Sequence, residues 1–389
     1  MHSIIENSFV KLKNYCEKED FMGWDPYDGL NSKVFQALPG IRNSKFCRLA
    51  WIQTFKRNPV NLRRLFLVQK DYNPKGLGLF LNGYCNLYRI ETKDVYLEKI
   101  HILANKILDL KSHGYSGACW GYNFNWESRA FFQPKYTPTI VASVFIGYAL
   151  MDAYDITGND RYLQEALSVT GFILKDLNRT FDSKNNFCFS YSPGDTSQVF
   201  NATLLGSRLL ARAYHYTKDK LLLVEAKKSI DYCINYQKED GSWSYGMLPF
   251  HQWIDNFHTG YNLECLSEYQ RYSGDISYQS TIDIGFEYYM NTFFLADGRC
   301  KYYNNSLYPI DIHAAAEAVI IFSRLGLRYR DLNNKVIRWM ISHLQDEKGF
   351  FYFQKHKFYG IRIPYIRWAQ AWAFHALISY LTSDERQKN

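Results

Sequence analysis

The densest group of reactive side chains in this sequence lies between residues 253 and 262, where a loop runs into an apolar helical pattern. Asp255, His258 and Asn262 follow at i, i+3 and i+7, which places all three on one face of a helix. Asp255 can be a helix N-cap and His258 a core histidine. Polar groups at this density are nevertheless costly to bury unless they are used, so the pattern favours a functional site.

A second segment, residues 308–317, has the same organisation. His313 and Glu317 stand at i and i+4 with Asp311 just ahead, and the alanines between them allow a ligand or a neighbouring helix to approach closely. A helix cap at Asp311 and a purely structural His–Glu pair explain the same residues. The spacing differs from the His-Glu-x-x-His pattern of zinc enzymes, and we expect neither a metal nor another cofactor.

A third segment carries an arginine into an apolar helical run. Arg367 and Trp368 follow Pro364, which fits the first turn of a helix. A buried arginine normally has an anionic partner, either a carboxylate of the protein or a carboxylate of a substrate. The equivalent position of an earlier helical run carries Asn201, which we include among the expected substrate contacts.

Two loops combine aromatic and polar residues. Residues 24–30 include Asp28, although Asp-Pro and Asp-Gly steps are also ordinary turn formers. Residues 120–126 interleave aromatic side chains with asparagines, and Trp120 and Tyr122 suit stacking on a sugar ring with hydroxyl contacts beside it. An aromatic tie between neighbouring structural repeats explains this composition equally well.

These residues support two kinds of chemistry on a carbohydrate. Hydrolysis of a glycosidic bond requires two carboxyl groups, and Asp255 and Asp311 come from successive helical runs that could present both to one cavity. Epimerisation or elimination at a uronate requires a base, an acid and a cation that neutralises the substrate carboxylate. The candidates for that scheme are His258, His313, Tyr261 and Arg367, with Glu317 as a further substrate contact.

The elements that position these residues recur along the chain. A short aromatic segment such as Gly241-Ser-Trp-Ser-Tyr245 returns at intervals of roughly 50 to 70 residues. A loop and an apolar helical run follow each copy, at residues 140–154, 199–214, 257–269, 312–325 and 366–381. Most of these runs end at a turn that contains Gly or Asp, and an amphipathic helix comes next, as over residues 162–177 and 222–236.

The repeating unit is therefore a helix, a tight turn, a second helix and an aromatic return. Division of the 389 residues by a unit of about 55 to 60 gives six or seven helical hairpins, as a closed α/α ring requires. An open superhelix of the tetratricopeptide type uses units of about 34 residues. We therefore predict an all-α, closed (α/α) toroid that forms one domain over residues 1–389, with residues 1–40 as an N-terminal helix and loop packed on the ring.

Composition limits the partners and the location of the protein. The 46 Lys and Arg residues exceed the 38 Asp and Glu residues by 8, which leaves a basic chain, and no nucleic-acid-binding motif is present. An acidic small molecule or glycan is therefore the better partner. The eight cysteines form no Cys-x-x-Cys pair, no secretion signal opens the chain, and no uninterrupted apolar run is long enough to cross a membrane. These features predict a cytoplasmic protein and leave its oligomeric state open.

One motif resembles that of a known toroid family. Gln237-Lys-Glu-Asp-Gly-Ser-Trp243 is similar to the Gln-x-x-x-Gly-x-Trp motif of terpenoid-cyclase toroids, and Gln345-Asp-Glu-Lys-Gly-Phe-Phe351 is a degraded copy. In such a motif glycine permits the turn after the outer helix, while the glutamine and the aromatic ring tie neighbouring repeats together. The Asp-rich catalytic signature of those cyclases is absent from the sequence, so the resemblance concerns the fold and not the reaction.

Residues 20–385 as a whole resemble the (α/α) toroid proteins of polysaccharide metabolism, also called six-hairpin glycosidase-like proteins. These include unsaturated glucuronyl hydrolases, polysaccharide lyases and the helical domain of glucuronyl C5-epimerases. The segments around Asp255 and Asp28 also look like those of members associated with capsule or exopolysaccharide genes. The resemblance implies an enzyme that modifies an acidic, uronate-containing glycan in cell-surface polysaccharide biosynthesis. A glycoside hydrolase on the same toroid, and a non-catalytic glycan-binding or scaffold protein, are the alternatives.

Overall fold

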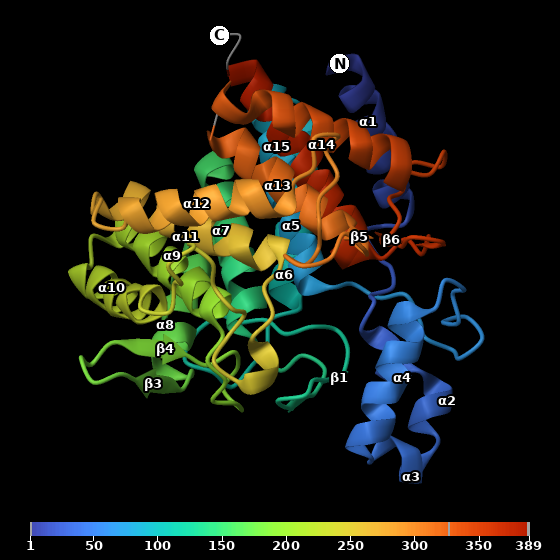
Figure 1. Cartoon of the computed structure of the whole chain (residues 1–389), viewed down its shortest axis with the longest axis horizontal. Helices are drawn as coiled ribbons and strands as arrows, with labels where there is room; N and C mark the ends of the chain where they lie inside the picture. The colour runs from blue at the N-terminus through green and yellow to red at the C-terminus, as the bar shows by residue number, and fades with distance from the viewer. Residues whose placement is uncertain (1, 326, 387–389) are drawn as a thin grey trace.

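The computed structural model describes residues 2–325 and 327–386, and in this part of the chain paired helices form a closed ring (Figure 1). The inner helices are α5 (Pro74–Ile90), α7 (Ile140–Thr157), α9 (Phe200–Thr217), α11 (Asn256–Ser273), α13 (Ile312–Leu325) and α15 (Trp372–Arg386). The outer helices are α6 (Asp94–Asp109), α8 (Asp160–Lys175), α10 (Lys220–Ile234), α12 (Gln279–Phe293), α14 (Arg330–Leu344) and α1 (His2–Lys18). Each inner helix packs against the next, and α15 packs against α5. The closed toroid is thereby confirmed, with six hairpins in the described residues.

Inner and outer helices differ in the spacing of their apolar residues. In α7 buried residues occupy every face, because other helices pack around it. Its ends are fixed locally: Thr139 Oγ1 accepts a hydrogen bond from the Ala142 amide at 3.0 Å, and Gly158 ends the helix at φ 64°. In α8 the buried residues recur every three or four positions, at Tyr162, Ala166, Val169, Phe172 and Ile173. This spacing covers one face and leaves the other to solvent.

Among the described helices, α7 is also the one that is long and apolar enough to cross a membrane, with a mean hydropathy of 1.4. Of this span, 67% is buried inside the ring. Its place among the inner helices accounts for its apolar character.

The first helix of the chain completes the last hairpin. Gln237 donates a side-chain hydrogen bond to the carbonyl of Thr281 in α12 at 2.9 Å, and Gln345 donates in the same way to the carbonyl of Ser8 in α1 at 3.0 Å. Gly349, at φ 96°, lets the two backbones approach, since a Cβ there would lie 2.4 Å from a carbonyl oxygen of α1. Helix α1 therefore occupies the position of the outer helix that follows α14.

Between α1 and α5 the chain leaves the ring. It forms a 3₁₀ turn (Asp28–Asn31) and the helices α2 (Lys33–Gln36), α3 (Pro39–Arg42) and α4 (Lys45–Arg57). These helices lie together beside the ring, at the lower right of Figure 1. They have a small core of their own, made by Leu30, Phe35 and Ile52. We call residues 29–70 the helical insertion. Helix α4 was not predicted from the sequence, because this segment lies outside the repeat.

Short strands line the loops that lead into the inner helices. Three antiparallel groups are formed by β1 (Trp126–Glu127) with β2 (Phe132–Gln133), β3 (Arg179–Phe181) with β4 (Phe187–Phe189), and β5 (Ile310–Asp311), β6 (Gln354–Lys355) and β7 (Gly360–Ile361). In the last group Asp311 pairs in register with Gln354. We call this end of the ring, where the inner helices begin, the loop end, and the opposite end the far end.

Candidate functional site

A cavity of about 410 Å³ opens at the loop end. Most of its wall is aromatic, with tyrosine, tryptophan and phenylalanine side chains contributed by the loops and by the first turns of the inner helices. The charged side chains that line it are Lys56, Lys75, Arg129 and Arg367, and no Asp or Glu of the described residues lines it. The cavity therefore offers flat apolar faces together with basic side chains.

One wall carries a histidine that is oriented by a buried carboxylate. His258 Nδ1 lies 2.9 Å from Asp255 Oδ2, and Asp255 also caps α11 by accepting a hydrogen bond from the His258 amide at 3.0 Å. Asp255 is buried, whereas the side chain of His258 remains 19% exposed towards the cavity. When Nδ1–H donates to the carboxylate, the lone pair of Nε2 is free to accept a proton. His258 is thus arranged as a general base.

A second imidazole lies close to the first. His313 Nε2 is 2.6 Å from the Tyr261 hydroxyl. Burial, with a further contribution from nearby cations, lowers the pKa of His313 well below its ordinary value, and burial raises the pKa of Tyr261. Phe257 contacts both imidazoles, with ring centroids 4.1 Å from His258 and 4.3 Å from His313. A neutral imidazole and a protonated phenol are therefore available beside the candidate base.

Lys75, which the sequence analysis did not select, lies at the bottom of the cavity in the first turn of α5. Its ammonium nitrogen lies 4.1 Å from the ring centroid of Phe145 and 5.3 Å from that of Trp372. Burial lowers the pKa of Lys75 well below its ordinary value. No hydrogen bond or ion pair joins this nitrogen to another described residue. The only sequence feature that marks Lys75 is its position as the one lysine of α5, directly before an apolar run.

Arg367 and Trp368 lie on a π-helical segment, Ile366–Ala371, that leads into α15. Such segments occur frequently at functional sites. Arg367 binds Asp25 through Nε at 2.7 Å and Nη2 at 2.9 Å, so the protein itself neutralises much of its charge. Trp368 lines the cavity and donates its indole N–H to Asp311 at 3.0 Å. The anionic partner expected for Arg367 is therefore a carboxylate of the protein, that of Asp25.

The two carboxylates considered for hydrolysis do not line the cavity. Asp255 lies behind His258, and Asp311 lies behind Trp368. Asp311 is fully buried and also accepts hydrogen bonds from Gln354 Nε2 at 2.6 Å and from the His313 amide at 2.8 Å. Burial raises the pKa of Asp311 to about 6. Both carboxylates therefore position aromatic side chains that face the cavity.

The other expected contacts divide between the cavity wall and the protein interior. Tyr122 and Asn201 line the cavity. Trp120 is fully buried and donates its indole N–H to the Ile107 carbonyl at 2.8 Å. Asp28 is buried and pairs with Arg63 at 2.7 Å, and Glu317 is buried below the cavity, where desolvation raises its pKa to about 8. These three lie outside the cavity wall.

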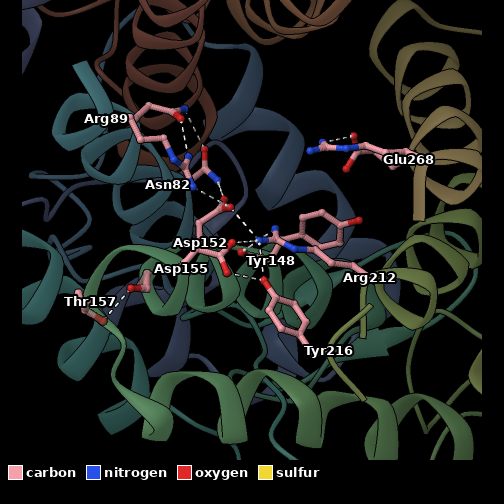
Figure 2. A network of polar contacts seen from close by, with 12 residues as sticks. Asn82, Arg89, Tyr148, Asp152, Asp155, Thr157, Arg212, Tyr216 and Glu268 are labelled. Carbon is pink, nitrogen blue, oxygen red and sulfur yellow. Dashed lines mark hydrogen bonds and ion pairs between the residues drawn. The ribbon is translucent and has the colours of Figure 1, made fainter. Parts of the chain in front are cut away.

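A larger hollow of about 740 Å³ lies at the far end. Figure 2 shows its polar side chains, which are largely paired with one another. Arg212 Nη2 lies 2.9 Å from Asp152 and 3.1 Å from Asp155, and Arg89 lies 3.4 Å from Asp152. The cations of this hollow are thus already compensated by protein carboxylates. Among the described residues, no group of three or more His, Cys, Asp or Glu side chains could hold a metal ion, here or at the loop end.

Comparison with known proteins identifies the fold. No protein family model matches the chain, and no curated protein matches its sequence. The cellobiose 2-epimerase from Bacillus thermoamylovorans B4167 is similar with a TM-score of 0.61 and 15% identity over 79% of this chain and 87% of that chain. A sugar epimerase from a ruminal bacterium gives a TM-score of 0.63 and 14% identity over 82% and 90%. An unsaturated glucuronyl hydrolase specific for heparin gives 0.61 and 13% over 82% and 89%. At these identities the shared feature is the six-hairpin toroid.

Proposed function

We propose that the protein is a carbohydrate-active enzyme that moves a proton at a carbon of an acidic, uronate-containing sugar, in an epimerase- or lyase-type reaction. One observation carries the proposal. The carboxylate-oriented His258 and the neutral His313 both line an aromatic cavity that contains basic side chains and no lining carboxylate among the described residues. Two of the similar structures are sugar epimerases by name, and we take this as support for the reaction class.

The side chains of the cavity suit an acidic substrate. Aromatic faces stack on the apolar face of a sugar ring, and Lys75 lies among them without a protein partner. Burial disfavours the charged form of Lys75, whereas a bound carboxylate would favour it. Substrate binding is therefore expected to coincide with proton uptake by this amine, and the substrate carboxylate takes the place of the missing partner.

The proposed reaction begins at the carbon next to the substrate carboxylate, C5 of a uronate. His258 Nε2 accepts the proton from this carbon, and Asp255 stabilises the resulting imidazolium. The negative charge passes into the substrate carboxylate, where Lys75 stabilises it. Return of a proton to the opposite face of C5 from the His313–Tyr261 pair gives the epimer. In a lyase the C4–O bond breaks instead, its oxygen leaves with a proton from the Tyr261 hydroxyl, and a double bond forms between C4 and C5.

A hydrolase is less well supported by this cavity. Glycosidic hydrolysis in most families uses two carboxyl groups that flank the bond, and neither Asp255 nor Asp311 faces the cavity. We retain the expectation of a cytoplasmic role in assembly of a cell-surface polysaccharide as part of the proposal. Eight free cysteines fit a reducing compartment.

The proposal is tested by product analysis with uronate-containing oligosaccharides in deuterated water. Deuterium at C5 indicates epimerisation, and ultraviolet absorbance of a 4,5-double bond indicates elimination. New reducing ends without either signal would support a hydrolase and contradict the proposal. Binding of the same sugars without any product, at all pH values between 5 and 9, would support the non-catalytic alternative.

A further inference from the structure

The helical insertion has a one-sided charge. Residues 29–70 contain nine basic residues and no Asp or Glu, although Asp28 and Asp71 directly flank them. This excess of nine is larger than the net charge of +8 of the whole chain. The nine residues are Lys33, Arg42, Lys45, Arg48, Lys56, Arg57, Arg63, Arg64 and Lys70.

Most of these cations form no ion pair with a carboxylate among the described residues. Three are paired with carboxylates outside the insertion: Arg63 with Asp28, Arg48 with Glu127 and Lys70 with Glu19. The other six form no ion pair with a described residue, and five of them are exposed. The exposed ones are Lys33, Arg42, Lys45, Arg57 and Arg64. Their charge is therefore available to an external anionic partner.

The insertion also exposes large apolar side chains. Phe46 is 78% exposed, Leu65 71% and Val60 64%. Four more belong to the set, namely Val34, Leu38, Ile41 and Leu67. Single exposed apolar residues are common on proteins, but seven within 34 residues of one basic segment are unusually many.

The position of the insertion makes this surface accessible. Helices α2, α3 and α4 stand away from the ring, and their own core is small (Figure 1). Lys56 of α4, together with Tyr27 just before the insertion, also lines the cavity at the loop end. The basic and apolar surface therefore belongs to an element that borders the mouth of the cavity.

We propose that the helical insertion docks on an anionic lipid membrane. Basic side chains are attracted to acidic headgroups, while exposed apolar side chains enter the boundary between headgroups and acyl chains. A soluble polyanion such as an acidic polysaccharide would engage the cations but would leave Phe46, Val60 and Leu65 in water. Docking in this way holds the mouth of the cavity near the bilayer surface. The inference does not depend on the reaction proposed for the cavity.

The test is co-sedimentation of the full chain with two kinds of vesicle. One contains phosphatidylcholine alone, and the other contains phosphatidylcholine and the anionic lipid phosphatidylglycerol at a ratio of about seven to three. We expect binding to the anionic vesicles only, and weaker binding as salt increases. Replacement of Lys33, Arg42 and Lys45 by Gln should weaken binding roughly a hundredfold, because each cation near an anionic surface contributes about fivefold. The pair Phe46→Ser and Leu65→Ser should weaken it about tenfold.

A matched control comes from the other side of the molecule. Lys220 and Leu221, at the start of α10, are also an exposed cation and an exposed apolar residue. Lys220→Gln with Leu221→Ser should leave vesicle binding unchanged. Equal binding of all variants, or no binding of the unaltered protein to anionic vesicles, would overturn the proposal. Retention on heparin that survives Phe46→Ser and Leu65→Ser, without vesicle binding, would identify a polyanion as the partner instead.

Discussion

The two ends of the ring differ in how their polar groups are used. The far-end hollow is the larger, at about 740 Å³ against 410 Å³, and it is rich in charge. Its arginines are bound to protein carboxylates, as with Arg212 and Asp152 at 2.9 Å. The cavity at the loop end is smaller and mainly aromatic, but Lys75 and the Nε2 side of His258 have no described protein partner there. The loop-end cavity is therefore the candidate active site because it contains reactive groups without protein partners, although the far-end hollow has the larger volume.

The far-end pairs have an evident structural role. Arg89 of α5 and Arg212 of α9 both bind Asp152 of α7, and Arg208 of α9 binds Glu264 of α11 at 2.8 Å. Each pair joins neighbouring inner helices. The ion pairs of the far end thus stabilise the ring, while the loop end carries the side chains that are available for a reaction.

Asp255→Asn should reduce turnover by about 10² to 10⁴-fold, because a positioned acid–base group contributes that much. Asparagine is as good a helix N-cap as aspartate, so α11 should keep its start. The melting temperature should therefore fall by only a few degrees, while kcat falls and KM changes little. Steady-state kinetics and a thermal melt measure both. An unchanged kcat would remove His258 from the reaction.

Asp152→Asn should have the opposite effect, a loss of stability without a loss of kcat. The side chain is 14% exposed and binds both Arg212 and Arg89, and loss of a buried partner typically costs about 3–5 kcal/mol. The melting temperature should fall by roughly 5 to 10 °C. At a temperature where the variant is folded, kcat should equal that of the unaltered protein. A large loss of kcat without a loss of stability would indicate that the far end takes part in the reaction.

Glu317→Gln should make the protein more stable at alkaline pH. Burial raises the pKa of this carboxyl from 4.5 to about 8, so the folded state favours its protonated form. The stability that this group contributes is complete below pH 4.5 and is lost as the pH rises through 8. Arg208 and Lys75 favour the ionised carboxylate and therefore reduce the difference, but burial outweighs them. The melting temperature of the variant minus that of the unaltered protein should therefore increase from pH 5 to pH 9, by the equivalent of ~2–4 kcal/mol. A flat difference would show that Glu317 is ionised in the folded protein.

Trp253→Ala should have the smallest effect. Trp253 is half-buried, lines the cavity and stacks on Tyr245 with ring centroids 4.3 Å apart. Loss of one aromatic face should weaken sugar binding about fivefold, the equivalent of about 1 kcal/mol. Titration calorimetry with a uronate oligosaccharide measures this change. Trp339→Ala, which removes a tryptophan of α14 outside the cavity wall, is the control and should leave binding unchanged.

The fold could be predicted from the sequence because its signal is local and repeated. The apolar run predicted at 140–154 is α7 (Ile140–Thr157), and the one at 312–325 is α13, since the same spacing, turn and return recur in each hairpin. The role of α1 as an outer helix has no such local signal. It depends on contacts between residues as far apart as Ser8 and Gln345.

The candidate site was only partly accessible to the same reasoning. His258, His313 and Trp368 stand out as polar or aromatic residues at the start of apolar helices, and all three line the cavity. The spacing of residues along a helix does not determine whether a carboxylate faces the cavity or the protein interior. For this reason the sequence suggested Asp255 and Asp311 as a pair for hydrolysis, although neither side chain lines the cavity. The contact of Arg367 with Asp25 spans 342 residues, and it forms only when the ring closes.

The most direct test of the account is the rate of deuterium incorporation at C5 of a bound uronate in deuterated water, followed by NMR for three proteins. The account predicts exchange with the unaltered protein, exchange slowed at least a hundredfold in Asp255→Asn, and unaltered exchange in folded Asp152→Asn. Equal exchange in Asp255→Asn and the unaltered protein, or exchange lost only in Asp152→Asn, would contradict the assignment of the reaction to the loop end.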